Sequence, residues 1–191
     1  TNINKVVVLG NDLKLGDKLL EAIENSKNVK TLGLNDDVQI KYDELKNTNI
    51  SGLEIKNKTG HISDEINKLI SERKEINHLI LHHNSDLNPD VFRDGREISI
   101  EILPDTFGNC VITNSLEQLI LKSNVKSLAI PCTANINVDL LKKIGTKIKI
   151  NSTKPGVNKL SDSLIEFFKQ NDSDKEIEID CNIDVYNTNM Q

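Results

Sequence analysis

Short apolar runs alternate with segments of helical periodicity along most of this chain. The clearest run covers residues 6–9 and is closed by Gly10, and Leu15, Leu19 and Ile23 follow it at helical spacing. A short, continuous, β-branched run is typical of a strand buried in a parallel sheet. The residues that follow predict an amphipathic helix packed on that strand. Alternation of the two kinds of segment favours an α/β fold.

The same alternation continues through the rest of the chain. We expect further strands at residues 31–34, 50–55, 78–81, 127–130 and 147–150, an edge strand at 177–185, and helices at 63–74, 106–122 and 161–169. These elements predict a Rossmann-type, doubly wound parallel sheet of six to seven strands with helices on both faces. In that arrangement the strand at residues 6–9 lies at the centre of the sheet, between the strands at 31–34 and 78–81.

The chain reads as one domain. We recognise no internal repeat and no low-complexity linker in its 191 residues, which are enough to bury a core. We therefore expect a single domain over residues 1–191, with residues 171–191 as a C-terminal edge strand and tail.

Charge and composition exclude several classes of partner. The formal net charge is -5, Lys and Arg are spread along the sequence, and only 3% of residues are aromatic. Nucleic-acid binding is not expected, because a basic stripe and stacking aromatics are both missing. No apolar run approaches the roughly 18 residues of a membrane span, and no signal segment is recognised at the N-terminus. We expect an intracellular protein, cytoplasmic or within an organelle.

The cysteines predict neither a metal centre nor a disulfide framework. Cys110, Cys132 and Cys181 are far apart and odd in number. We expect reduced thiols that pack as small hydrophobic side chains. His82 and His83 are adjacent on a predicted strand and point to opposite faces, so they cannot bind one metal ion together.

Four short motifs follow predicted strands. They read L-G-N-D-L-K-L-G at residues 9–16, H-H-N-S at 82–85, I-P-C-T at 130–133 and I-N-S-T-K-P-G at 150–156. In this order they resemble the short-chain dehydrogenase/reductase family, which carries T-G-x-x-x-G-x-G, N-N-A-G, a pair of serines and V-N-x-x-x-P-G at those places. The resemblance extends over nearly the whole chain and implies a Rossmann-type fold that binds NAD(P).

The resemblance does not extend to the catalytic residues of that family. Its members use Tyr and Lys, spaced Y-x-x-x-K, on the helix after the fifth strand. Between Thr133 and the predicted strand at 147–150 this chain has no Tyr, and the interval is too short for the usual loop and helix. Tyr42 and Lys46 have the same spacing but lie between the second and third predicted strands, so we interpret that match as accidental. No catalytic residue is predicted.

A vestigial or weak cofactor site is the remaining candidate. Gly10 and Gly16 can form a phosphate-binding turn, with Lys14 in place of the middle glycine. Asp36 follows the second predicted strand, where an acidic residue binds a ribose hydroxyl in dinucleotide sites. In the alternative interpretation the two glycines only turn the chain and Asp36 is solvated. We expect no cofactor, with weak NAD(P) binding as the alternative.

These observations predict a non-catalytic relative of the family that acts as an interaction or scaffold subunit. The alternatives are an NAD(P)-dependent oxidoreductase with an atypical active site and a nucleotide-binding regulator. We expect a protein partner or a homo-oligomer. The predicted interface is the apolar stripe of the 106–122 helix, because the helix that covers it in the family is shortened here. That stripe comprises Ile112, Leu116, Leu119 and Ile120. In the alternative, other parts of the same chain cover it.

Overall fold

The structure is a computed structural model. It describes residues 3–8, 16–40, 42–56, 60–145, 147–153, 158–170, 175–180 and 183–184.

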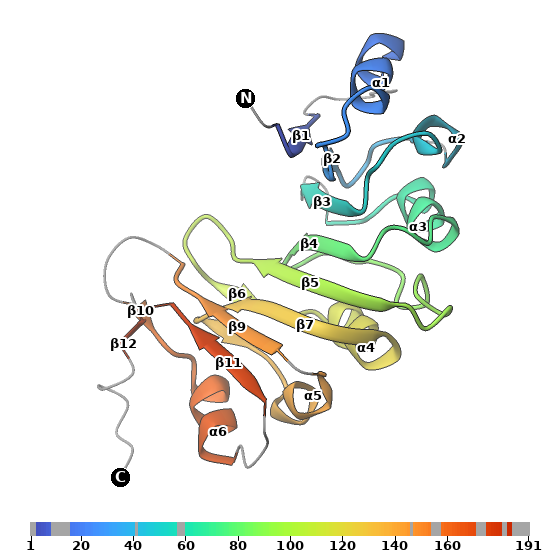
Figure 1. Cartoon of the computed structure of the whole chain (residues 1–191). Helices are drawn as coiled ribbons and strands as arrows, with labels where there is room; N and C mark the ends of the chain where they lie inside the picture. The colour runs from blue at the N-terminus through green and yellow to red at the C-terminus, as the bar shows by residue number, and fades with distance from the viewer. Residues whose placement is uncertain are drawn as a thin grey trace.

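One parallel sheet of eight strands forms the centre of the molecule (Figure 1). Its strands are β1 (Lys5–Val7), β2 (Thr31–Asn35), β3 (Gly52–Lys56), β4 (His78–His82), β5 (Glu97–Leu103), β7 (Asn124–Pro131), β9 (Lys147–Asn151) and β11 (Glu176–Ile179). They lie side by side in the order in which they occur in the chain, with β1 and β11 at the two edges. Every neighbouring pair is parallel.

Most of the connections between these strands contain a helix. The helices are α1 (Asp17–Glu24), α2 (Tyr42–Leu45), α3 (Asp64–Glu72), α4 (Asn114–Lys122), α5 (Val138–Lys143) and α6 (Asp162–Gln170). Two small parallel pairs complete the fold, β6 (Cys110–Val111) with β8 (Ala134–Asn135) and β10 (Asn158–Lys159) with β12 (Ile183–Asp184). Both pairs follow the carboxyl ends of strands in the main sheet.

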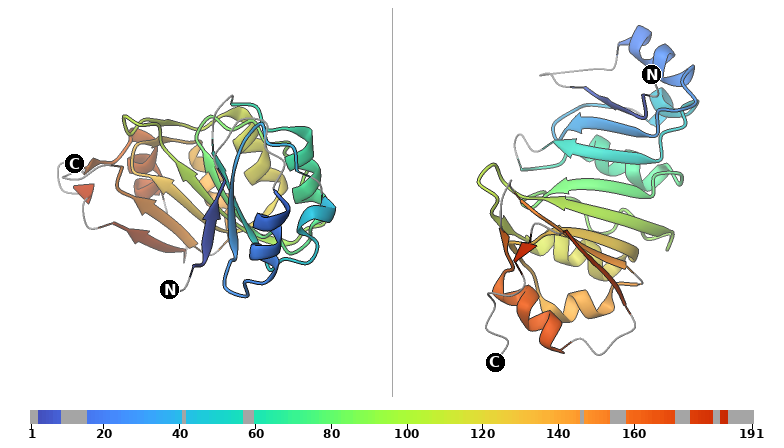
Figure 2. Two further views of the ribbon diagram at one scale, coloured as in Figure 1. Left: turned by 90° about the horizontal axis from the view of Figure 1, so that it is seen from above. Right: turned by 60° about the vertical axis from the view of Figure 1, so that its left-hand side comes forward.

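The predicted α/β class with a parallel sheet is confirmed, and the edge strand expected near residue 177 is present as β11. The strand number is higher than expected, and the strand order corrects the doubly wound arrangement. Residues 5–7 lie at an edge of the sheet next to β2, and β4 lies three strands from β1. The helices lie along one face of the sheet and not on both (Figure 2). This follows from the strand order. The connections between parallel strands are right-handed, and when each one leads to the next strand in the same direction across the sheet, the helices all lie on the same face.

Strand β5 explains why the expected order was wrong. Its sequence E-I-S-I-E-I-L alternates polar and apolar residues, and only Ile98, Ile100 and Ile102 are buried. This alternation differs from the continuous apolar runs that mark strands buried on both faces, and residues 97–103 were not predicted as a strand. Without β5, the segment at 127–130 was counted as the fifth strand, and the helix expected at 106–122 was given about two turns too many at its start. It begins at Asn114.

The core lies between the sheet and the helices. Alternate residues of the strands point to the helices and are buried, including Leu32 and Leu34 on β2, Leu79 and Leu81 on β4, and Ile148 and Ile150 on β9. They pack with the apolar faces of the helices in one continuous cluster, to which Phe92 and Phe167 contribute the largest side chains.

The predicted interface stripe belongs to this core. Ile112 precedes helix α4, and Leu116, Leu119 and Ile120 are its inward side chains, all at most 7% exposed. The stripe is therefore covered within the chain, as the alternative interpretation held, and the expectation that it is exposed was wrong. The physical reason is the same strand order, because α4 packs directly on the sheet instead of beside a missing helix.

A short motif recurs where the chain turns back from the sheet. It consists of a buried apolar residue, a capping residue and a second buried apolar residue three positions after the cap. The five copies begin at Ile62-Ser63, Leu87-Asn88, Ile112-Thr113, Ile136-Asn137 and Leu160-Ser161. In each copy the side-chain oxygen of the capping residue accepts a backbone N–H two or three residues later. The chain therefore contains an internal repeat, contrary to the expectation from the sequence.

Two arginine side chains close the carboxyl ends of helices α2 and α3. Arg73 donates to the carbonyl oxygens of Leu45 and Thr48 at the end of α2. Arg96 donates to the carbonyls of Ile70 and Arg73 at the end of α3, and its guanidinium lies 4.6 Å from the centre of the Phe92 ring. Cations at this end of a helix satisfy carbonyls that have no partner within the helix and interact favourably with its dipole.

No helix in the described part of the chain is both long and apolar enough to cross a membrane.

Candidate functional site

The face of the sheet opposite the helices is the candidate site. We call it the open face, because in the described ranges the helices pack on the other side (Figures 1 and 2). Strand pairing aligns its side chains in two continuous rows that cross all eight strands. The first row is Lys5, Thr31, Gly52, His78, Ser99, Ser127, Lys147 and Glu176, and the second is Val7, Gly33, Glu54, Ile80, Glu101, Ala129, Lys149 and Glu178.

Small side chains produce a hollow in the middle of the open face. Ser99 and Ser127 are neighbours in the first row, and Ala129 is in the second. The cavity above them has a volume of about 120 Å³, and we call it the central hollow. Its side-chain lining is His78, Ser99, Glu101, Ser127, Ala129, Lys147 and Lys149. The Ser127 hydroxyl donates to the Ser99 hydroxyl at 2.8 Å, which fixes both oxygens at the floor of the hollow.

One end of the open face carries a buried carboxylate. Glu54 on β3 is only 3% exposed and forms ion pairs with Lys5 on β1 and Lys56 on its own strand. Burial raises the pKa of Glu54, but the hydrogen bonds and charges of the two lysines outweigh burial and hold the pKa below its ordinary value. On the intervening strand, Gly33 pairs with Val7 on one side and with Glu54 on the other, so β2 contributes no side chain beside Glu54 in that row.

The other end carries a ladder of lysine and glutamate. Lys147 on β9 lies 3.0 Å from both Glu176 and Glu178 on β11, and Lys149 lies 2.9 Å from Glu178. Hydrogen bonds from the two lysines lower the pKa of Glu178, and those to the two glutamates raise the pKa of Lys147. The four charges of this ladder balance one another.

His82 lies at the carboxyl end of β4. Burial lowers its pKa, and the positive charge of Lys56 lowers it further. The imidazole is therefore neutral at pH 7. His83 points elsewhere, and its Nδ1 lies 3.3 Å from the carbonyl oxygen of Val111. No group of three or more His, Cys, Asp or Glu side chains in the described ranges is placed to hold a metal ion.

The structure describes two of the four residues predicted to bind a cofactor, Gly16 and Asp36. Gly10 and Lys14 lie outside the described residues. Gly16 is the residue before helix α1 and has extended backbone angles, φ -67° and ψ 143°, that any residue can adopt. Asp36 is buried, and its carboxylate accepts the backbone N–H of Gly60 at 2.8 Å. Asp36 therefore joins two loops of the fold, and the nucleotide site, which also needs Gly10 and Lys14, stays a prediction.

The prediction that cysteines pack as small hydrophobic side chains is confirmed for the two residues that the structure describes. Cys110 and Cys132 are free and buried in the core. Burial raises the pKa of Cys110 to about 12 and also raises that of Cys132. Neither thiol is a good nucleophile, because the reactive form is the thiolate. Thr133, beside Cys132, donates its hydroxyl to the carbonyl oxygen of Gly108 at 2.6 Å.

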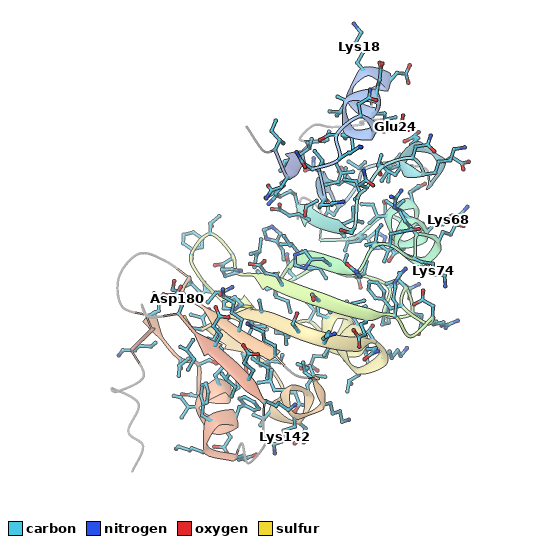
Figure 3. All side chains as sticks on the ribbon, viewed as in Figure 1. Lys18, Glu24, Lys68, Lys74, Lys142 and Asp180 are labelled. Atoms are coloured by element: carbon cyan, nitrogen blue, oxygen red, sulfur yellow. The ribbon has the colours of Figure 1, made fainter. Side chains whose placement is uncertain are left out.

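Two larger cavities lie away from the open face. A polar groove of about 550 Å³ runs between α3 and residues 88–94, on the side where Figure 3 labels Lys68 and Lys74. Several of the charges there are paired, as in Lys74 with Asp94 at 2.9 Å and Lys122 with Asp90 at 3.2 Å. A second cavity of about 370 Å³ lies between Phe107 and Lys159, at the end of the sheet where Figure 3 labels Asp180.

The open face was missed in the sequence because its residues are spread over the whole chain. Ser99, Ser127 and Lys147 become neighbours only through strand pairing. The signal that could have found it is the recurring apolar–cap motif, since a repeated strand-and-turn unit predicts strands stacked in order.

No protein-family model, curated protein or solved structure matches the chain.

Proposed function

We propose that this chain is a non-catalytic binding module that holds a partner protein on the open face of its sheet. The observation that carries the proposal is the strand order. It places the described helices on one side of the sheet, so that the two rows of side chains on the open face point away from them. A face of this kind is rigid because each strand between the two edge strands is hydrogen-bonded to two neighbours.

The spacing of the strands supports a repeat architecture. Along the first row, successive residues are 20 to 29 positions apart in the chain, the shortest step being Ser127 to Lys147 and the longest Lys147 to Glu176. Leucine-rich repeat proteins build a horseshoe from one strand and one helix in about 20–29 residues. Solenoids of this type use their extended concave surface for binding. We extend that architecture and that use of the surface to this chain.

The chemistry of the open face is that of a recognition surface. It combines paired charges at both ends with small side chains and hydroxyl groups in the middle. A polar, charged rim of this kind surrounds the centre of protein interfaces.

Selection of displayed random peptides on the purified protein tests this proposal. Ala129→Trp fills the central hollow and is expected to abolish binding of most selected peptides. Ser71→Trp makes the same kind of change on the exposed side of α3 and is expected to leave binding unchanged. If the selected peptides still bind the Ala129 variant but no longer bind the Ser71 variant, the binding surface lies on the helices. Failure to select any peptide would also count against a binding module.

A further inference from the structure

The central hollow contains one carboxylate that the sheet does not neutralise. Glu54, Glu97 and Glu178 on the same face each have a lysine within 4 Å. Glu101 is half-buried at the wall of the hollow, and among the described residues no cation lies within that distance of its carboxylate. A half-buried charge without a counterion is costly, because it loses hydration and gains no ion pair.

The neighbours of Glu101 explain why it stays unpaired. In its row it lies between Ile80 on β4 and Ala129 on β7, neither of which carries a charge. The next cation in the row is Lys149, one strand beyond Ala129, and it is bound to Glu178 at 2.9 Å. Because Lys147 is also held by two glutamates, the hollow as a whole retains one negative charge.

The hollow also offers hydrogen-bond acceptors beside that charge. The linked hydroxyl groups of Ser99 and Ser127 lie in the adjacent row, on the same two strands as Glu101 and Ala129. A guanidinium has five N–H donors in a planar fork that matches a carboxylate and nearby oxygens. The small side chain of Ala129 and a volume of about 120 Å³ leave room for one such group.

We infer that the central hollow binds an arginine side chain of the partner protein, with the Glu101 carboxylate as its counterion and Ser99 and Ser127 as additional acceptors. This inference rests on the proposed function, since it names the chemistry of the partner at that face. Glu101 is the residue that determines specificity, because it distinguishes a basic side chain from a neutral or acidic one.

The experiment uses a peptide that displayed libraries select on the wild-type protein and that Ala129→Trp displaces. Such peptides are expected to be enriched in arginine. Synthetic analogues with each arginine replaced by citrulline, a neutral group of nearly the same shape, identify the one that enters the hollow. That replacement is expected to weaken binding about 10- to 100-fold, as for loss of a charge-assisted hydrogen bond.

Glu101→Gln, combined with the citrulline replacement, completes a double-mutant cycle between the protein and the peptide. In this variant the arginine peptide is expected to bind as weakly as the citrulline peptide binds wild type, and the citrulline replacement is expected to have little further effect. Glu97→Gln is the matched control, because Glu97 lies on the same strand and is paired with Lys126. It is expected to leave binding unchanged. The Glu101 variant is also expected to melt at the same or a higher temperature than wild type, since it removes an unpaired charge.

The outcomes separate the two proposals. If Ala129→Trp abolishes binding while citrulline and Glu101→Gln change nothing, the open face binds a partner but arginine recognition is wrong. If the selected peptides are insensitive to Ala129→Trp, the binding module itself is wrong at this face. If Glu101→Gln fails to fold, the citrulline analogues on wild-type protein decide the inference, and an unchanged dissociation constant for all of them overturns it.

Discussion

Glu54 is a charged side chain that the fold buries on an otherwise open face. Lys5 and Lys56 approach it from β1 and from its own strand, and the two ion pairs compensate for its lost hydration. The contact with Lys5 joins the edge strand to the third strand across β2. A Cβ atom added at Gly33 would come within 3.0 Å of the Val7 side chain, so the glycine is needed there for space.

The lowered pKa of Glu54 predicts a pH dependence of stability. A carboxyl whose pKa is lower in the folded state stabilises the fold above its unfolded value and loses that contribution as pH falls through the folded value. Wild type is therefore expected to lose stability below pH 4.5, the ordinary value for this group. Glu54→Gln is expected to be less stable at pH 7 and to lose less on acidification, so that the two curves of unfolding free energy converge. Urea denaturation from pH 7 to pH 3 measures both curves.

An exposed residue provides the control for this titration. Glu72→Gln changes a carboxyl that is 43% exposed and only loosely paired with Lys68. Its stability curve is expected to remain parallel to that of wild type. Curves for Glu54→Gln that also stay parallel to wild type would show that the ion pairs do not stabilise the folded state.

Arg73 is expected to be the most sensitive buried cation. It is only 3% exposed, and its two guanidinium contacts satisfy the carbonyl groups that end α2. Arg73→Met keeps the apolar part of the side chain but leaves those carbonyls without their donors. We expect a loss of about 1–3 kcal/mol in the free energy of unfolding per unsatisfied group, measured by urea denaturation. Lys68→Met, on an exposed surface of α3, is expected to change stability by less than about 0.5 kcal/mol. Equal effects of the two substitutions would contradict the capping role.

At the scale of single elements, helix α4 shows how one helix serves the fold. Thr113 caps its first turn, three inward side chains enter the core, and Leu121 lies outward with 42% exposure. The helix is therefore amphipathic, and its apolar stripe packs on the sheet of the same chain.

A pair of leucines on α4 tests this assignment. Leu116→Ala removes a fully buried side chain and is expected to cost about 2–5 kcal/mol of unfolding free energy. Leu121→Ala makes the same chemical change on the exposed side and is expected to cost less than about 0.5 kcal/mol. Both values come from chemical denaturation, with the size in solution measured alongside. A change of oligomeric state in the Leu116 variant without loss of stability would restore the interface interpretation.

At the scale of the whole molecule, the sheet has a centre and two edges. Strands β4, β5 and β7 each pair on both sides, whereas β1 and β11 pair on one side only. Hydrogen exchange followed by mass spectrometry is expected to show the strongest protection in the middle strands and the weakest in β1 and β11, because an edge strand can open without disturbing a second neighbour. The doubly wound order would give the opposite result for residues 5–7, which would then lie in the centre and exchange slowly.

Much of the fold could be predicted from the sequence, because local signals are strong in this chain. The strands expected at 31–34, 78–81 and 147–150 lie within β2, β4 and β9, and the helix expected at 161–169 corresponds to α6. The strand β5 was missed because one side of the sheet is not covered, so its sequence alternates instead of running apolar. The open face was missed for a related reason. Glu101 and Ser127 are ordinary polar residues until pairing places them in one hollow.

The sequence by itself determined the alternation of strand and helix, the caps that begin the helices and the apolar residues that face the core. These depend on interactions between residues a few positions apart, such as Ser63 with the backbone of Ile66. Only the tertiary structure decided which strands are neighbours. Every strand offers similar apolar side chains to the helices, so periodicity alone does not distinguish a sheet that winds in two directions from one that winds in a single direction. That choice placed β1 at an edge and the helices on one face, and it created the open face to which we assign the function.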